Sequence, residues 1–323
     1  GVGTLGIIDF DDVDVSNLQR QIAFSYDDIG KAKAEQLQKR LQGINPHIEI
    51  VTYKDRFGIE NAETLFNEYD VVVDGCDNFG TRYLSNDTSF FTKTPLVFGA
   101  IHRFQGQMSL FNQDEKSPCY RCLFPDPPDA GSIPNCAEAG VLGVLPGVVG
   151  TIQATEAVKA ILNLGESLSG RFMTYDAMIM RFCEFKLSKN PSCPLCGKKP
   201  KITDLKEMEL LCPSQSIKED DISPSELSEE MKTNKDVYLI DVREETEWEI
   251  CKLDEANTIP LRMIEDVASV LPKDKDIVVY CHTGIRSRQA VDILKNCGLK
   301  KVRNLSGGIN QWAEEVDTDM PQY

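Results

Sequence analysis

Short apolar runs alternate with segments of helical spacing along the first 190 residues. The strand-like runs are residues 4–9, 48–53, 71–73 and 96–99, and the helix-like segments between them are residues 31–41, 61–68 and 81–91. This succession predicts a parallel sheet with crossover helices, because parallel strands need long connections. Residues 107–111 and 172–187 read as antiparallel additions to that sheet, with a helix of small residues at 148–162 between them. We therefore predict a doubly wound α/β domain.

The pattern changes after residue 198. Residues 199–220 are polar and carry no sustained apolar period, which predicts a linker. Ser223 and Glu226 then form a capping-box pattern with a proline at the first helical position, and we take this as the start of a second domain. Within it, the apolar run 277–280 predicts a buried strand and residues 287–294 predict a helix. The predicted organisation is a domain at 1–198, a linker at 199–220 and a small α/β domain at 221–323.

The excess of acidic residues argues against polyanionic binding partners. The chain has 35 basic and 51 acidic residues and a formal net charge of −16. Nucleic acids and anionic membranes would be repelled overall, so we expect neither direct nucleic-acid binding nor membrane association. Apolar runs stay shorter than a bilayer requires. The chain has 11 cysteines, an odd number, and four of them form two Cys-x-x-Cys pairs, which favours metal and thiol chemistry in the cytoplasm over a disulfide framework.

The two cysteine pairs predict a metal site. Cys119 and Cys122 form the first pair, and Cys193 and Cys196 form the second. Four thiolates close a tetrahedral zinc site, and a site closed in this way has a structural role because no position is open for substrate. The alternative is four unrelated buried cysteines.

One further cysteine ends the strand-like run 277–280. Cys281 opens a six-residue loop, residues 281–286, directly before a helix-like segment. Loop amides, the helix N-terminus and Arg286 would all favour a sulfur anion at that position, and Gly284 gives the loop the backbone freedom it needs. We predict a reactive thiol. The alternative is a structural cysteine at the end of a core strand.

The last 105 residues or so resemble the rhodanese family of sulfurtransferases. The resemblance rests on the Cys281 loop, on residues 239–244 (LIDVRE) and on residues 304–312 (NLSGGINQW). A six-residue active loop is similar to that of the sulfur-carrying rhodaneses, whereas relatives that act on phosphate esters have a longer loop. The resemblance implies that Cys281 carries transferable sulfur as a persulfide, with Arg286 in the same loop.

The loop after the first strand is a candidate nucleotide site. In a doubly wound sheet, nucleotides bind at the carboxyl ends of strands, and an acid such as Asp9 often binds ribose there. Arg20 in this loop and Lys33 in the helix-like segment after it would be able to reach phosphates. From these residues alone, an ordinary polar loop before a helix is an equal alternative.

Residues 1–200 resemble the ThiF/MoeB adenylyltransferase family, whose fold is shared with ubiquitin-activating enzymes. The resemblance rests on Asp9 to Asp11, residues 16–21 (SNLQRQ), residues 30–33 (GKAK) and residues 74–78 (DGCDN), together with both cysteine pairs. It implies a Rossmann-like adenylation domain with zinc knuckles that uses MgATP to adenylate the C-terminal glycine of a ubiquitin-like sulfur carrier. The implied ligands of ATP and Mg2+ are Asp9 for the ribose, Arg20, Gln21 and Lys33 for the triphosphate, and Asp77 for the metal, with Asn78 and Arg82 supporting that loop.

The same resemblance makes two further implications. Cys136 aligns with a second functional cysteine that captures the activated carrier or accepts a mixed disulfide, although a packing role before a glycine-rich turn is the alternative. Family members also have a glycine-rich nucleotide loop upstream of the strand with which this sequence opens. We therefore expect this polypeptide to be an N-terminally truncated adenylation domain.

Together the two resemblances predict a fused adenylyltransferase and sulfurtransferase. Such fusions resemble the activators for molybdopterin synthesis and for tRNA thiolation. The expected partners are a ubiquitin-like sulfur carrier of the MoaD/ThiS type, a sulfur donor such as a cysteine desulfurase or thiosulfate, and a second copy of the chain in a homodimer. The alternatives are a stand-alone rhodanese sulfurtransferase and a carrier-binding platform without catalysis.

Overall fold

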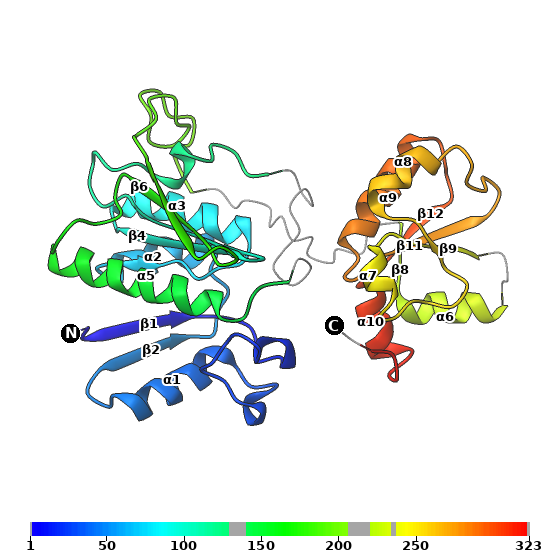
Figure 1. Cartoon of the computed structure of the whole chain (residues 1–323), viewed down its shortest axis with the longest axis horizontal. Coiled ribbons are helices and arrows are strands. Elements are labelled where there is room, and N and C mark those ends of the chain that lie inside the picture. Colours follow the sequence, from blue (N-terminus) through cyan, green and yellow to red (C-terminus); the bar gives the residue numbers. More distant parts are fainter. Residues whose placement is uncertain (1, 129–139, 206–219, 234–236, 322–323) are drawn as a thin grey trace. The chain divides into compact units, whose positions relative to one another are not determined.

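A computed structural model describes residues 2–128, 140–205, 220–233 and 237–321 (Figure 1). The chain divides into two compact units, Gly1–Cys212 and Pro213–Tyr323, and each has its own sheets and apolar core. The domain limits 1–198, 199–220 and 221–323 that the sequence suggested stay predictions.

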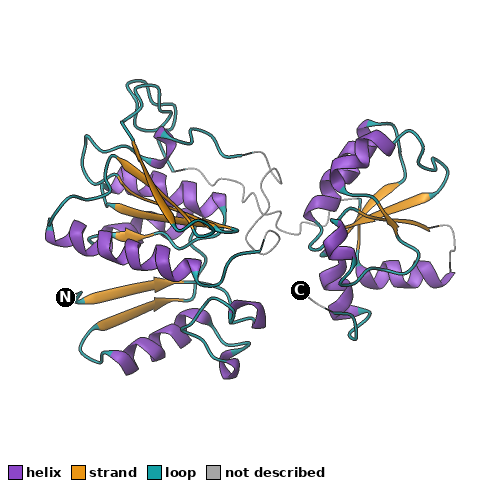
Figure 2. Ribbon diagram, viewed as in Figure 1, coloured by secondary structure: helices purple, strands orange, loops and turns teal. Residues whose placement is uncertain are grey.

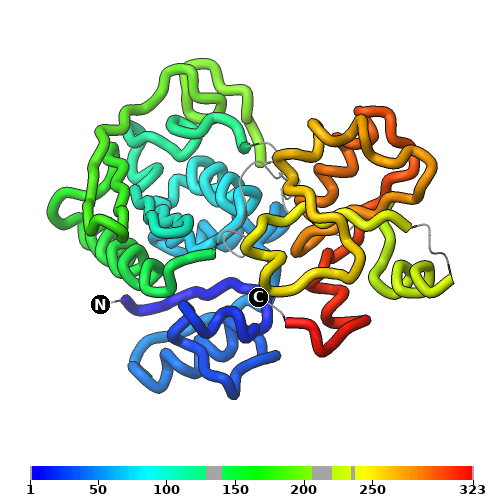
Figure 3. Tube along the Cα trace, turned by 45° about the vertical axis from the view of Figure 1, so that its right-hand side comes forward, coloured from blue at the N-terminus to red at the C-terminus, as the bar shows by residue number. Residues whose placement is uncertain are grey.

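The front unit contains two sheets. In the first, β1 (Thr4–Ile8) pairs in parallel with β2 (Glu49–Tyr53), and α1 (Lys33–Ile44) connects them (Figure 3). The second has the strand order β3-β4-β5-β6-β7, comprising Val72–Val73, Leu96–His102, Gln105–Phe111, Arg171–Asp176 and Arg181–Lys186. Its first pair is parallel and the others are antiparallel, as the sequence predicted. Among the described strands, β1 pairs only with β2 and β3 only with β4.

Helices cover both faces of the second sheet (Figure 2). Alternate residues of β4 point to opposite faces. Leu96 and Phe98 join an aromatic cluster with α2 (Ile59–Glu68) and α3 (Phe79–Thr92), whereas Val97 packs with α5 (Leu145–Leu162). The predicted alternation of strands and helices and the α/β class are confirmed.

The first helix begins later than its pattern indicated. The sequence suggested 31–41, but α1 spans Lys33–Ile44. Gly30 has a φ of 77°, its amide donates to the carbonyl of Val13, and Val13 in turn donates to Lys31. These bonds hold residues 30 and 31 in a turn, so the helix starts only after it.

The rear unit is built on one parallel sheet of strand order β10-β9-β11-β12-β8. The strands are Asn257–Thr258, Val237–Asp241, Asp276–Tyr280, Val302–Leu305 and Asp221–Ile222. One face packs against α8 (Ile264–Val267) and α9 (Ile285–Asn296), and the other packs against α6 (Pro224–Thr233) and α10 (Gly308–Glu315). A short helix, α7 (Glu245–Trp248), follows β9.

The predicted capping box is present at the start of α6. The Ser223 amide donates to Glu226 Oε2 at 2.9 Å, and the Glu226 amide donates to Ser223 Oγ at 3.3 Å. None of the described helices combines the length and the apolar character needed to cross a bilayer.

Candidate functional sites

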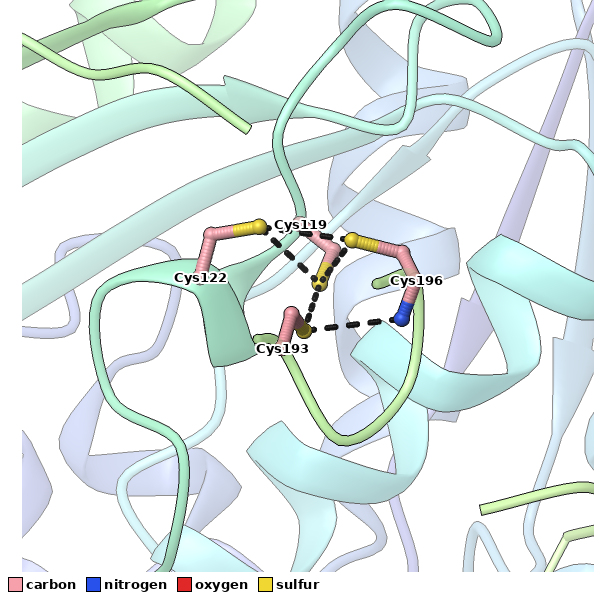
Figure 4. A group of neighbouring side chains, drawn as sticks. All are labelled: Cys119, Cys122, Cys193 and Cys196. Atoms are coloured by element: carbon pink, nitrogen blue, oxygen red, sulfur yellow. Dashed lines mark hydrogen bonds between the residues drawn. The ribbon is translucent and has the colours of Figure 1, made fainter. Parts of the chain in front are cut away.

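The four cysteines of the two predicted pairs meet in one cluster (Figure 4). Cys119 Sγ lies 3.8, 3.5 and 3.4 Å from the sulfurs of Cys122, Cys193 and Cys196, respectively. A tetrahedral zinc site with Zn–S bonds of ~2.3 Å has sulfur–sulfur edges of about 3.8 Å. The spacing and the thiol donors therefore fit zinc, and the alternative of four unrelated cysteines is wrong.

Backbone amides support this cluster. The Asn190 amide donates to Cys122 Sγ at 3.3 Å, and the Cys196 amide lies 3.5 Å from Cys193 Sγ. Such N–H···S contacts favour the thiolate form that a metal requires. Because η3 (Tyr120–Cys122) follows β5 and the second pair follows β7, a metal here would tie the two ends of the antiparallel segment together.

The predicted ribose ligand lies at the carboxyl end of β1. Asp9 Oδ1 accepts from the Asp11 amide at 2.9 Å, which leaves the second carboxylate oxygen for a ligand. Burial raises the pKa of Asp9. The Asp11 amide and Lys33 oppose that rise, and the carboxylates of Asp11 and Asp77 add to it. Asp9, which follows β1, thus lies within electrostatic reach of both Lys33 on α1 and Asp77, which follows β3 of the second sheet.

The predicted phosphate ligands lie in the loop after β1 and, in the case of Lys33, at the first residue of α1. Lys33 Nζ binds Asp11 Oδ2 at 2.8 Å, and its side chain is only 11% exposed. Arg20 donates to the Ser16 carbonyl at 3.0 Å. Gln21 Oε1 is buried and has no hydrogen-bond partner, so a donor from outside the described residues would satisfy it. Asp11 as the partner of Lys33 was not foreseen, although its place two residues after Asp9 is a usable signal.

The residues predicted around magnesium follow β3. Asp77 is exposed there, as an oxygen donor of the kind Mg2+ prefers. Asn78 is the N-cap of α3, because its Oδ1 accepts from the Thr81 amide at 2.8 Å. Arg82 donates to the Cys76 carbonyl at 3.1 Å and lies 3.8 Å from Asp74. The carboxylate at 77 fits a magnesium ion, and the residues beside it hold the loop in place.

Arg82 is itself fixed by aromatic rings. Its guanidinium carbon lies 5.4 Å from the ring centroid of Phe79 and 5.5 Å from that of Phe98. On the other side of the loop, Gln153 of α5 donates to the Asp74 carbonyl at 2.7 Å. This contact was not predicted from the sequence, because a polar residue inside a helix pattern does not show which strand it will meet.

Cys281 lies directly after β11 and is fully buried. The Gly284 amide donates to its Sγ at 3.1 Å, and Ser287 Oγ lies 3.4 Å from the same atom. Gly284 has a φ of 91°, the left-handed conformation that the sequence argument required. The loop therefore brings donors to the sulfur, as expected of a site for a sulfur anion.

Arg286 makes a contact that the sequence did not indicate. Its NH1 and NH2 donate to Glu247 Oε2 and Oε1, each at 2.7 Å. Glu247 is the third residue of α7 and lies 39 positions earlier in the chain. The capping-box pattern Glu244-x-x-Glu247 is visible in the sequence, but it does not show that Glu247 also binds Arg286.

Cys136, the predicted second functional cysteine, lies outside the described residues, so its role stays a prediction.

Comparison with known proteins places these sites in two families. The ThiF family model matches residues 1–195, and the model of the Rhodanese-like domain matches residues 223–315. Both resemblances found in the sequence are confirmed.

Three curated relatives match most of the chain. "Probable adenylyltransferase/sulfurtransferase MoeZ" of Mycobacterium tuberculosis is 40% identical, over 100% of this chain and 84% of that protein. "Adenylyltransferase and sulfurtransferase MOCS3" of Drosophila grimshawi is 35% identical, over 100% and 76%. "Sulfur carrier protein adenylyltransferase" of Thermus thermophilus is 47% identical, over 66% of this chain and 80% of that protein.

The crystal structure of E. coli MccB with ATP has a TM-score of 0.51 at 21% identity, and the match covers 61% of this chain and 60% of that one. At this identity the likeness shows a shared fold.

Proposed function

Because the chain belongs to the ThiF family through its front unit and carries a rhodanese-like domain behind it, we propose that it is an adenylyltransferase and sulfurtransferase acting on a ubiquitin-like sulfur carrier. It would adenylate the carrier's C-terminal glycine and then deliver sulfur from Cys281 to leave a thiocarboxylate. The observation that carries this proposal is the presence of both families in one chain, together with the names of the relatives MoeZ and MOCS3, which combine adenylyltransferase and sulfurtransferase.

In the adenylation step, the reacting groups are all anionic. The carrier's carboxylate attacks the α-phosphorus of ATP and pyrophosphate leaves, so neutralising charge and positioning the reactants are the main tasks. We assign Asp9 to the ribose hydroxyls, and Arg20, Gln21 and Lys33 to the phosphates. Lys33 is bound to Asp11 and would exchange that carboxylate for a phosphate oxygen.

Asp77 is our candidate for the Mg2+ ligand, with Asn78 fixing the start of α3. When bound, the ion would neutralise charge on the phosphates. Arg82 holds the Cys76 carbonyl and so fixes the loop from which the Asp77 carboxylate extends. The four-cysteine cluster would hold zinc in a structural role, because four thiolates leave no coordination position for substrate.

In the sulfur-transfer step, Cys281 would carry a persulfide. The Gly284 amide and the Ser287 hydroxyl are placed to donate to an anionic sulfur. The outer sulfur of the persulfide attacks the carrier's acyl-adenylate and AMP leaves. A second thiol then attacks the Cys281 sulfur of the resulting acyl disulfide, so the thiocarboxylate leaves with the electron pair of the broken S–S bond and a disulfide forms between Cys281 and the second thiol. Cys136 is our candidate for that thiol, and a cellular thiol reductant would reopen the disulfide.

The partners and location follow from this chemistry. We propose a sulfur carrier of the MoaD/ThiS type, a persulfide or thiosulfate donor, a homodimer, and a place in molybdopterin biosynthesis. A reducing compartment keeps the cluster thiols and Cys281 available, which supports a cytoplasmic location.

Carrier-dependent ATP–pyrophosphate exchange tests the first half of the proposal. It is measured on this polypeptide with a series of carriers that end in glycine. We expect exchange that requires both Mg2+ and such a carrier. If none of these carriers supports exchange, the adenylyltransferase proposal is wrong, and ATP-independent sulfur transfer by Cys281 becomes the function to pursue.

A further inference from the structure

The only lysine or arginine in the sulfur loop is held by a carboxylate. Arg286 and Glu247 form a two-pronged ion pair in which both hydrogen bonds measure 2.7 Å. The side chains are 18% and 16% exposed, so the pair is largely shielded from solvent. Paired hydrogen bonds of this kind are among the strongest between side chains, which makes spontaneous release of the arginine costly.

Glu247 is fixed independently of the arginine. Its Oε2 also accepts from the Glu244 amide at 2.9 Å, which closes the capping box of α7. The carboxylate is therefore held at the start of a helix, where the backbone amides favour a negative charge. The Glu247 carboxylate is therefore held in position by its own helix, and Arg286 binds to it there.

The charge around Cys281 follows from this pair. Arg286 contributes little net positive potential to the loop while Glu247 neutralises it. The next arginine, Arg288, is also paired with a carboxylate, through one contact from its NH2 to Asp221 Oδ1. Glu245 and Glu249 add carboxylates on and beside α7, whereas Glu244 is itself paired with Arg262. A donor with two negative charges would meet no uncompensated arginine at the start of α9.

We propose that Glu247 determines the donor specificity of the sulfur site by disfavouring dianionic inorganic donors such as thiosulfate. The inference rests on the proposed sulfur-transfer function of Cys281 and names the residue that selects among its donors. Held by Glu247, Arg286 shapes the loop without attracting an oxyanion. A persulfide on a thiol, which presents at most one negative charge at its sulfur, is excluded less strongly.

Sulfur transfer from thiosulfate to cyanide measures how well Cys281 uses thiosulfate as a donor. The Cys281 thiolate attacks the outer sulfur of thiosulfate, a new S–S bond forms, and sulfite leaves with the electron pair of the broken bond. Cyanide then takes the outer sulfur as thiocyanate and restores the thiolate. Thiocyanate formation therefore measures sulfur transfer without ATP or carrier.

The variant that tests the proposal is Glu247→Gln. Glutamine keeps an oxygen that can accept from the Glu244 amide, but it removes the charge that neutralises Arg286. We expect the KM for thiosulfate to fall by about threefold to tenfold, with a smaller change in kcat, as one newly uncompensated charge near the surface predicts. Glutathione persulfide as donor should change less than about twofold, because its sulfur carries less charge.

Two matched variants test whether the released Arg286 is the cause of the lower thiosulfate KM. Glu245→Gln removes the same charge from an exposed position of α7, and it should lower the thiosulfate KM by much less than Glu247→Gln does, because it leaves the Arg286–Glu247 ion pair in place. Adding Arg286→Met to Glu247→Gln should abolish the gain, because the released arginine is its source. An unchanged or higher KM in a Glu247→Gln protein with wild-type melting temperature would overturn the proposal.

Salt gives a test that needs no variant. In the wild-type protein, added salt should lower the thiosulfate KM, because it screens repulsion by the nearby carboxylates. A KM that rises with salt would show that Arg286 already attracts the donor, and this would overturn the proposal even if Glu247→Gln failed to fold. Absence of thiocyanate from both donors in the wild-type protein would contradict sulfur transfer by Cys281 itself, which is a separate failure.

Discussion

The backbone amide of Ile309 donates a hydrogen bond of 2.9 Å to the carbonyl oxygen of Cys281. The next amide, that of Asn310, donates to the His282 carbonyl at 3.0 Å. The first turn of α10 thus binds the carbonyl groups at the start of the sulfur loop. Within the same loop, the Gly284 amide bonds to the sulfur of Cys281. The segment from the end of β12 to the start of α10 is therefore part of the sulfur site, although none of its side chains is assigned a chemical role.

This contact predicts that Gly308→Ala damages the sulfur site. A Cβ at position 308 would lie 2.4 Å from the carbonyl oxygens of both Cys281 and His282, and the residue has a φ of 61°. The backbone must shift to relieve the overlap, so we expect a loss of roughly 2–4 kcal/mol in the stability of the rear unit. Thiocyanate formation should fall by more than the unfolded fraction explains. Chemical denaturation and sulfurtransferase assays measure the two effects.

Gly298→Ala is the matched control for strain without overlap. Gly298 has a φ of 92°, but a Cβ there would meet nothing within 4 Å. It should cost only the conformational penalty, about 1 kcal/mol, and leave sulfur transfer intact. If the two variants were equally stable and equally active, the carbonyl contact would not matter to the site.

Most of the fold could be predicted from the sequence, because strands, helices, caps and metal-binding pairs are set by residues close together in the chain. The strand and helix periods, the Ser223 capping box and the two cysteine pairs each depend on residues a few positions apart. The same holds for Cys281 and Gly284, whose spacing already defines the loop.

The contacts that the sequence did not reveal join distant segments. Glu247 meets Arg286 across 39 positions, and Gln153 meets Asp74 across 79. Many carboxylates along an acidic chain would have been equally good partners for that arginine. Only the sheet order, which brings β9 next to β11, selects one of them.

Asp9→Asn should stabilise the front unit at neutral pH while weakening nucleotide binding. Burial raises the pKa of Asp9 above 3.8, so its ionised form is disfavoured in the folded protein. Removing the charge therefore raises the melting temperature at pH 7, and the gain shrinks as the pH falls through the raised pKa. Asparagine keeps the acceptor for the Asp11 amide but lacks the second carboxylate oxygen for the ribose. Melting curves from pH 4 to 8 and binding of a fluorescent ATP analogue measure the two effects.

Asp14→Asn should have the opposite effect on the stability of the front unit. Hydrogen bonds from Ser16 lower the pKa of Asp14, so its charge favours the folded state above that pKa. This variant should lower the melting temperature at neutral pH. A gain in stability from Asp14→Asn, or a loss from Asp9→Asn, would contradict the assigned electrostatics.

Cys193→Ser should release the metal and unfold the front unit selectively. Cys193 is fully buried in the four-sulfur cluster, and a structural zinc site contributes on the order of 10 kcal/mol to folding. We expect bound zinc near one equivalent in the wild-type protein, its loss in the variant, and a lower melting transition for the front unit with that of the rear unit unchanged. Cys183→Ser, at an exposed position of β7, is the control and should retain zinc. Metal analysis with calorimetry decides, and full zinc content in Cys193→Ser would refute the site.

Cys281→Ala should separate the two half-reactions. Cys281 lies in the rear unit, whereas Asp9, Lys33 and Asp77 lie in the front unit, so removing the thiol should leave carrier-dependent pyrophosphate exchange within about twofold of wild type. Thiocyanate and thiocarboxylate formation should both disappear, because the sulfur that accepts from the Gly284 amide and the Ser287 hydroxyl is gone. Cys297→Ala, an exposed cysteine at the end of α9, should keep both activities. Mass spectrometry of the carrier detects the thiocarboxylate directly. If the thiocarboxylate still forms without Cys281, another thiol carries the sulfur. If the variant loses pyrophosphate exchange, the assignment of adenylation to the front unit and sulfur transfer to the rear unit is wrong.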